Sequence, residues 1–238
     1  MSDQPENKQG VASGVDTLRP TLAATHGSPL LKRLFDLAAV LAGLWLIWPL
    51  LVLIALWVKL DSPGPVFFRQ VRVGRGGQLF RIHKFRTMQI GAEASGQLTV
   101  GADARVTRAG RLLRKTKLDE LPQLLDVLFG DMSLVGPRPE VPKYVAHYPA
   151  AVKEIVLSVR PGITDLASIE FRDESALLAR SSDPERTYVE QILPAKLHHA
   201  QQYVRTRSLW LDLRIIARTA LAVLGLHTSR RPDSADNP

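Results

Sequence analysis

The run LAAVLAGLWLIWPLLVLIALWV, from Leu37 to Val58, contains no charged residue. As a straight α-helix it would extend about 33 Å, which is long enough to cross the hydrocarbon core of a bilayer. Pro49 lies near its middle, where a proline removes one backbone hydrogen bond and clashes with the preceding turn. The sequence therefore predicts a membrane helix that is broken at Pro49, within a membrane element that covers residues 29–60.

Basic residues flank this run on both sides, with Lys32 and Arg33 before it and Lys59 directly after it. Segments with basic flanks tend to keep those flanks on the cytoplasmic side of a membrane. A broken, re-entrant helix that enters the bilayer and returns to the same face satisfies both observations. A kinked helix that crosses the bilayer is the alternative, and the physical argument alone weighs the two about equally.

Composition narrows the class of partner. The chain has 238 residues, with 31 Lys and Arg against 23 Asp and Glu, which gives a formal net charge of +8. This balance suits an anionic partner, namely nucleic acid, anionic lipid or a phosphorylated substrate. Nucleic acid is disfavoured, because the basic residues cluster at turns and no aromatic stacking platform interleaves with them. The chain has no cysteine, which excludes a disulfide framework and a thiolate metal site.

The rest of the chain divides into two tails and one domain. Residues 1–28 and 227–238 are predicted to be disordered tails, and residues 61–226 are predicted to form the domain. Within it, Val66–Val73 and Leu79–Phe85 are two predicted strands, which the glycine-rich GRGG at 74–77 joins into a hairpin.

Helical patterns account for most of the remaining domain. Thr107 is the predicted N-cap of a basic helix that ends at Lys115. The segment Leu209–Leu226 has an apolar face that charged residues interrupt, so it is predicted to lie in the membrane interface or to pack on the core. The predicted fold class is α+β, a re-entrant membrane helix followed by a mainly helical cytosolic domain with a small β-hairpin and interfacial amphipathic helices.

Two carboxylates, Asp119 and Glu120, stand side by side before a predicted helix. Among many Arg and Lys residues, such a pair can divide a phosphoryl transfer: one carboxylate attacks phosphorus and the other holds a divalent metal. The alternative is a solvated acidic pair at a helix start. Arg138 stands between two prolines, whose φ angles are fixed. This rigid backbone presents the guanidinium to a ligand with little conformational entropy to lose on binding.

Six blocks resemble the bacterial sugar transferase family, the monotopic polyprenyl-phosphate phosphoglycosyl transferases, in order and in spacing. The resemblance covers about Leu31 to Ile169 and is to the small, core-only members of the family. The blocks are KRLFD at 32–36, SPGPVFFRQ at 62–70, KFRTM at 84–88, RVTRAG at 105–110, LDELPQL at 118–124 and GDMSLVGPRP at 130–139.

The resemblance implies a reaction. A UDP-sugar would give its sugar-1-phosphate to undecaprenyl phosphate, and UMP would leave. It also implies a place, the cytoplasmic face of the bacterial inner membrane, with a re-entrant helix broken at Pro49. The oligomeric state stays open, and a homodimer is the assembly considered.

By position in the matching blocks, the resemblance implies roles for particular residues. Asp119 would be the nucleophile of a covalent phosphosugar intermediate, and Glu120 would bind Mg²⁺. Arg114 and Arg138 would hold phosphate. Lys84 and Arg86 fall in a block that lines the same site and are included as phosphate-binding candidates.

Overall fold

The computed structural model describes residues 28–171 and 174–223. The predicted tails at 1–28 and 227–238 lie outside the described residues, apart from Ser28. The described chain is mostly helical and contains two two-stranded sheets, which confirms the predicted α+β class. We call residues 62–171 and 174–223 the head domain.

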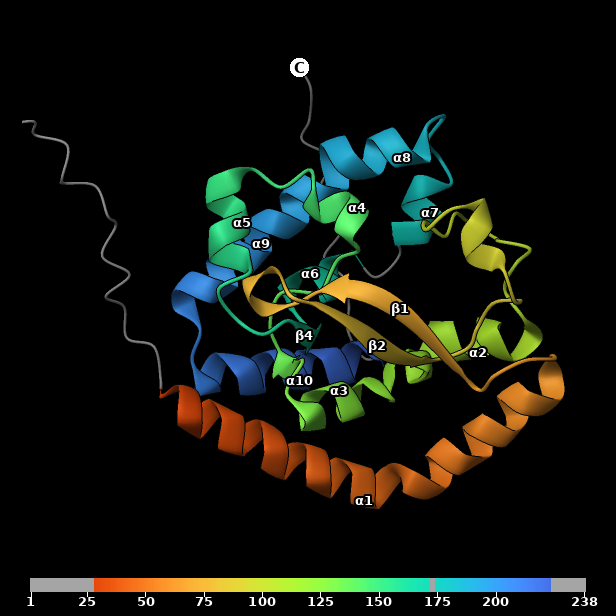
Figure 1. Cartoon of the computed structure of the whole chain (residues 1–238), viewed down its shortest axis with the longest axis horizontal. Helices are drawn as coiled ribbons and strands as arrows, with labels where there is room; N and C mark the ends of the chain where they lie inside the picture. The colour runs from red at the N-terminus through yellow and green to blue at the C-terminus, as the bar shows by residue number, and fades with distance from the viewer. Residues whose placement is uncertain (1–27, 172–173, 224–238) are drawn as a thin grey trace, which may run out of the picture.

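The predicted membrane element is the helix α1 (Pro29–Asp61), which contains Pro49 in its interior. Figure 1 shows that α1 is bent and runs along one side of the head domain, below α3 and α10. Among the described residues it is the helix that is long and apolar enough to cross a membrane. Much of its apolar surface is uncovered, including Trp45 and Trp48, which are 79% and 60% exposed.

The N-terminal end of α1 is attached to the head domain by charged contacts. Lys32 Nζ lies 2.7 Å from Asp36 Oδ1 and 2.9 Å from Asp212 Oδ2 on α10 (Leu209–Val223). Arg33 donates hydrogen bonds to the carbonyl oxygens of Val127 and Leu128, at 2.6 and 3.1 Å. These carbonyls belong to the last turn of α3 (Gln123–Phe129), so Arg33 satisfies acceptors that the helix itself leaves free.

The C-terminal end of α1 is attached to the same domain. Arg86 donates to the carbonyl oxygens of Val58, Ser62 and Pro63, and Asp61 Oδ2 accepts a 3.0 Å hydrogen bond from the Ala109 amide. Both ends of α1 therefore bind the head domain.

The predicted hairpin is confirmed as β1 (Phe67–Val73) and β2 (Leu79–Phe85), which pair antiparallel. The turn between them is η1 (Arg75–Gly77), where Gly76 and Gly77 have φ of 67° and 80°, a conformation that glycine adopts without strain. In this register Lys84 lies opposite Phe68. Since side chains alternate along a strand and directly opposed residues share a face, Gln70 and Arg72 lie on the same face as Lys84.

The carboxylate pair lies between two short helices. Thr107 caps α2 (Arg108–Thr116) by accepting a 2.9 Å hydrogen bond from the Gly110 amide, which confirms the predicted cap. Lys117 then adopts a left-handed conformation with φ of 59°. This turns the chain into η3 (Leu118–Glu120), which holds both carboxylates, and α3 follows.

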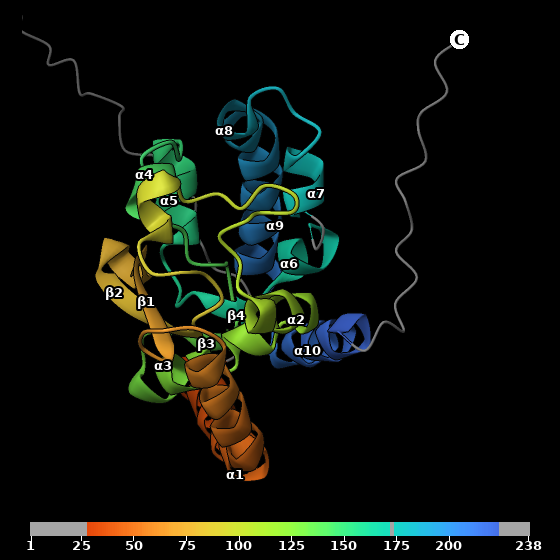
Figure 2. The same ribbon diagram turned by 90° about the vertical axis from the view of Figure 1, so that its right-hand side faces the viewer.

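The strands β3 (Ser133–Val135) and β4 (Gly162–Thr164) pair in parallel next to α10. Short helices complete the domain, and many of them lie on the side away from α1 (Figures 1 and 2). They are η2 (Ala92–Ser95), α4 (Pro142–Val145), α5 (Ala150–Val156), α6 (Leu166–Glu170), α7 (Glu174–Leu178), α8 (Pro184–Thr187) and η4 (Tyr188–Ile192). The longer α9 (Leu193–Thr206) packs against α5, α6 and η4.

The helix α10 has two different faces. Ile215 is fully buried in the core, whereas Trp210 is 76% exposed. The sequence left two alternatives for this helix, and the structure shows that it packs on the core with one face while it leaves an aromatic side chain uncovered.

Candidate active site

A cavity of about 1340 Å³ lies between η3, the hairpin, the turn at residues 136–139 (the Arg138 turn) and the helices α6, α7 and α9. Asp119 and Glu120 line it, together with all four basic residues that the sequence singled out, Lys84, Arg86, Arg114 and Arg138. The cavity is large enough for an extended ligand that reaches well beyond the carboxylate pair.

Asp119 is buried at the cavity wall, and its Oδ1 has no hydrogen-bond partner among the described residues. Burial raises the pKa of this carboxyl, and the nearby Lys84 opposes that rise. A buried carboxylate oxygen without a partner carries a desolvation cost, so the fold leaves the hydrogen-bonding capacity of this oxygen unused within the described residues.

Glu120 has the opposite environment. It accepts a 2.7 Å hydrogen bond from Lys84 Nζ and binds Arg138 through both guanidinium nitrogens, with Nη1 at 3.1 Å from Oε2. Burial by itself would raise the pKa of Glu120, but Arg138 and Lys84 together hold it well below its usual range. The two neighbouring carboxyls are therefore driven apart in pKa, which is the pattern expected when two acids perform different tasks.

Lys117 and Arg72 belong to this site, and the sequence reasoning missed both. The left-handed backbone of Lys117 is uncommon for a residue other than glycine, and it lies directly before the carboxylates. Burial lowers the pKa of its ammonium, and Arg138 lowers it further. Arg72 donates a 3.0 Å hydrogen bond to the Pro139 carbonyl. Strand alternation from Lys84 would have found Arg72, had the register of the hairpin been known.

Arg114 lies in the last turn of α2 and donates a 2.7 Å hydrogen bond to Thr99 Oγ1. Its positive charge is one of those that act to lower the pKa of Asp119. The guanidinium therefore lies within electrostatic reach of the carboxylate pair, with some of its donors still free for a ligand.

Arg86 is different from the other basic residues. Its side chain is 4% exposed and its guanidinium donates to three carbonyl oxygens at the end of α1 and just after it. The structure thus gives Arg86 a structural task, the attachment of α1, and brings Lys84 and Arg138, rather than Arg86, into contact with Glu120.

The residues at the pair fit a Mg²⁺ ion. Asp119 Oδ1 is unpartnered, and Glu120 Oε2 accepts a hydrogen bond from one donor, so it keeps acceptor capacity. No group of three or more His, Cys, Asp or Glu side chains gathers within residues 28–171 and 174–223. Mg²⁺ does not need one, because it is usually held by one or two carboxylates together with waters and substrate phosphates.

Comparison with known proteins agrees with this geometry. Residues 27–226 match the family described as bacterial sugar transferase.

The chain belongs to the bacterial sugar transferase family.

Individual family members are similar over most of the chain. A Caulobacter vibrioides protein named UDP-glucose:undecaprenyl-phosphate glucose-1-phosphate transferase is 40% identical, and the match covers 94% of this chain and 81% of that protein. A Xanthomonas campestris protein of the same name is 40% identical over 83% of this chain. An Aeromonas hydrophila protein named UDP-N-acetylgalactosamine-undecaprenyl-phosphate N-acetylgalactosaminephosphotransferase is 39% identical over 82% of this chain. The chain spans 40% and 44% of the length of the Xanthomonas and Aeromonas proteins.

The contacts of Arg86 predict the effect of its replacement. We expect Arg86→Lys to lower the free energy of unfolding by about 2 kcal/mol, because one ammonium cannot replace a guanidinium that serves three carbonyls. Thermal unfolding in detergent measures this, with Arg81→Lys at an exposed position of the same hairpin as the matched control. A raised KM for a phosphorylated donor at unchanged stability would instead assign Arg86 to phosphate binding.

Proposed function

We propose that this chain transfers a sugar-1-phosphate from a UDP-sugar to undecaprenyl phosphate and releases UMP. The names of its relatives support the substrate classes. Two observations support the chemistry. Asp119 is buried and its Oδ1 has no hydrogen-bond partner among the described residues. The neighbouring Glu120 is held in its ionised form by Arg138 and Lys84.

In the first step, one Asp119 oxygen attacks the sugar-bearing phosphorus of the donor. A new bond forms between that oxygen and phosphorus, and the bond from phosphorus to the bridging oxygen of UMP breaks, so UMP leaves with the electron pair. The product is an acyl phosphate that joins Asp119 to the sugar-1-phosphate. Arg138, Lys84 and Arg114 lower the barrier by placing positive charge where the diphosphate develops negative charge.

In the second step, a phosphate oxygen of undecaprenyl phosphate attacks the same phosphorus. The bond between phosphorus and Asp119 breaks, and the carboxylate is restored. The product is a lipid-linked diphosphosugar. Because the first product leaves before the second substrate reacts, the kinetics are of the ping-pong type.

Glu120, with its remaining acceptor capacity on Oε2, is the residue that would hold Mg²⁺ beside Asp119. Bound there, Mg²⁺ would neutralise the charge of the diphosphate that a carboxylate has to approach. Arg138 and Lys84 keep Glu120 ionised, which a metal ligand requires.

A direct assay tests this function. Purified protein in detergent, given Mg²⁺, undecaprenyl phosphate and a panel of UDP-sugars, is expected to release UMP and to form one lipid-linked diphosphosugar per UMP. Release of inorganic phosphate or free sugar phosphate without a lipid-linked product would identify a phosphatase or nucleotidase and overturn the proposal.

We also propose that α1 is re-entrant in the bacterial inner membrane and that the head domain lies on the cytoplasmic face. Two ends that bind one domain lie on one side of a bilayer, and Arg33 and Asp61 attach the two ends of α1 to the head domain. The interior Pro49 and the basic flanks support the same topology. Exposed Trp210 on α10 and Phe129 on α3, at 76% and 68%, suit helices that rest in the interface.

Thiol labelling tests the topology cleanly, because the natural chain has no cysteine. Cysteines introduced singly at Ser28 and at Ser62 are both expected to resist a membrane-impermeant reagent in intact cells and to react after permeabilisation. Labelling of only one of the two cysteines in intact cells is the result that a spanning helix predicts.

Pro49→Ala is expected to favour a straight helix and to lower activity without altering the head domain.

A further inference from the structure

A second group of charged side chains lines the same cavity, away from the carboxylate pair. Glu140 Oε1 accepts a 2.6 Å hydrogen bond from the hydroxyl of Tyr188 on η4. Lys196 Nζ, on α9, lies 3.4 Å from that hydroxyl and 4.0 Å from Glu140 Oε1, and it forms an ion pair with Glu174 on α7. We call Glu140, Glu174, Tyr188 and Lys196 the second cluster.

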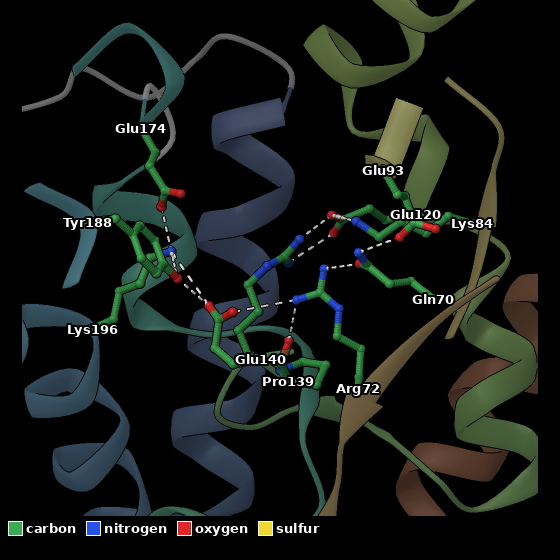
Figure 3. A network of polar contacts seen from close by, with 11 residues as sticks. Gln70, Arg72, Lys84, Glu93, Glu120, Pro139, Glu140, Glu174, Tyr188 and Lys196 are labelled. Atoms are coloured by element: carbon green, nitrogen blue, oxygen red, sulfur yellow. Dashed lines mark hydrogen bonds and ion pairs between the residues drawn. The ribbon is translucent and has the colours of Figure 1, made fainter. Parts of the chain in front are cut away.

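This cluster is close to the reactive pair. Glu140 follows Arg138 by two residues, so their Cα atoms are at most about 7 Å apart, and Arg138 binds Glu120. Figure 3 shows Glu174, Tyr188 and Lys196 on one side, Glu120 and Lys84 on the other, and Glu140 with Arg72 between them. Arg72 Nη1 lies 3.6 Å from Glu140 Oε2, and both residues line the cavity that the two groups share.

The proposed transfer leaves this cluster without a task, although burying polar groups such as those of Glu140 and Tyr188 is costly. Their hydrogen-bonding capacity is also not used up. Glu140 Oε2 accepts no hydrogen bond from the described residues, and the side chains of Lys196 and Glu174 are 16% and 25% exposed, with both lining the cavity. Burial raises the pKa of Tyr188, so its hydroxyl stays neutral and donates to Glu140.

Carboxylates and an ammonium that face a cavity are partners for hydroxyl groups, since a hydroxyl both donates and accepts. The position suits the sugar as well. The phosphorus that Asp119 attacks is joined to the sugar through one bridging oxygen. The hexose ring therefore has to lie directly beside the carboxylate pair. Relatives of nearly equal identity are named for glucose and for N-acetylgalactosamine, which fits selection of the sugar by a few side chains.

We infer that the second cluster is the subsite that binds the hexosyl group of the donor, with Glu140 and Lys196 as the specificity-determining residues. This inference rests on the proposed function. It assigns the hydroxyl-bearing sugar, rather than the nucleoside, to the part of the cavity between Glu140, α7 and α9.

The test compares donors rather than overall activity. UMP release from UDP-glucose, UDP-galactose, UDP-N-acetylglucosamine and UDP-N-acetylgalactosamine is measured for the wild type and for Glu140→Gln, Lys196→Met and Glu174→Gln. Loss of a hydrogen bond to a sugar hydroxyl is expected to change the ratio of kcat/KM between the preferred donor and its epimer by about 10-fold or more. Inhibition by UMP, which lacks both the reacting phosphorus and the hexosyl group, is expected to keep the same Ki.

Glu190→Gln is the matched control, because Glu190 also forms an ion pair, with Arg186, but is exposed and lies outside the cavity. Thermal unfolding shows which variants keep the fold, and Glu174→Gln, at the more exposed carboxylate, remains informative if Glu140→Gln does not fold. An equal loss of kcat/KM for every donor, with the ratio between donors unchanged, would mean that the cluster only holds α7, η4 and α9 together. A raised Ki for UMP would assign the cluster to the nucleotide. Either result overturns the inference while wild-type transfer stands, whereas a wild type that is inert with every donor contradicts the proposed function itself.

Discussion

Asp119→Asn is expected to abolish UMP release, with a rate at least about 10³-fold below that of the wild type. The amide has nearly the shape of the carboxylate but is a far poorer nucleophile. Asp119 Oδ1 has no hydrogen-bond partner within residues 28–171 and 174–223, so the substitution breaks no hydrogen bond of this atom there. The loss should therefore appear in the chemical step and leave the thermal unfolding temperature unchanged or raised.

The covalent step gives this prediction a second measurement. With UDP-sugar and Mg²⁺ but no polyprenyl phosphate, the wild type is expected to release a burst of up to about one UMP per active molecule. Mass spectrometry should then find one added sugar-phosphate group on the peptide that contains Asp119, and Asp119→Asn should show neither burst nor adduct. Asp131→Asn, at an exposed aspartate outside the cavity, is the control. A sequential mechanism, with no UMP until lipid is added, would leave Asp119 a base or metal ligand at most.

Glu120→Gln is expected to lower activity by about 10²- to 10³-fold. The change removes one formal charge with little change in size, and it takes away the anion to which Lys84 and Arg138 are bonded. Two half-buried cations then lose the carboxylate that lies between them, and a divalent metal loses its charged ligand. Removing one partner of an ion pair that is largely shielded from water lowers stability, so activity is to be measured below the lowered unfolding temperature.

Metal removal separates the two effects of Glu120. Excess chelator is expected to abolish wild-type activity, and added Mg²⁺ is expected to restore it, while Glu120→Gln needs a higher Mg²⁺ concentration for its residual rate. Glu154→Gln, at an exposed glutamate outside the cavity, should behave as the wild type. If the wild type works equally well in excess chelator, Glu120 serves only to position Arg138 and Lys84.

The elements that sequence predicted well are those set by local rules. The hairpin follows from alternation on both sides of a glycine-rich turn, and the Thr107 cap follows from a hydroxyl that precedes a helix. The carboxylate pair needed no tertiary information either, because its two members are adjacent in the chain.

Pairs of residues that lie far apart in the chain were beyond those rules. The period of a strand puts Lys84 and Arg86 on one face, yet Lys84 binds Glu120 and Arg86 binds the carbonyls at the end of α1. Sequence spacing treats the two alike, and only the docking of α1 against the hairpin separates them. In the same way, nothing local connects Glu140 with Lys196, since their contact arises from the packing of α9 behind the Arg138 turn.

The sequence by itself determined the family and located the long apolar helix and the adjacent carboxylate pair, because these depend on composition, periodicity and contiguous motifs. The tertiary structure alone decided how the two carboxylates differ. Asp119 and Glu120 are neighbours of similar chemistry, but packing brings Arg138 and Lys84 to one of them and leaves an oxygen of the other buried without a partner. Their opposite pKa shifts follow from which charges the fold places around each carboxyl, and those charges come from segments distant in the chain.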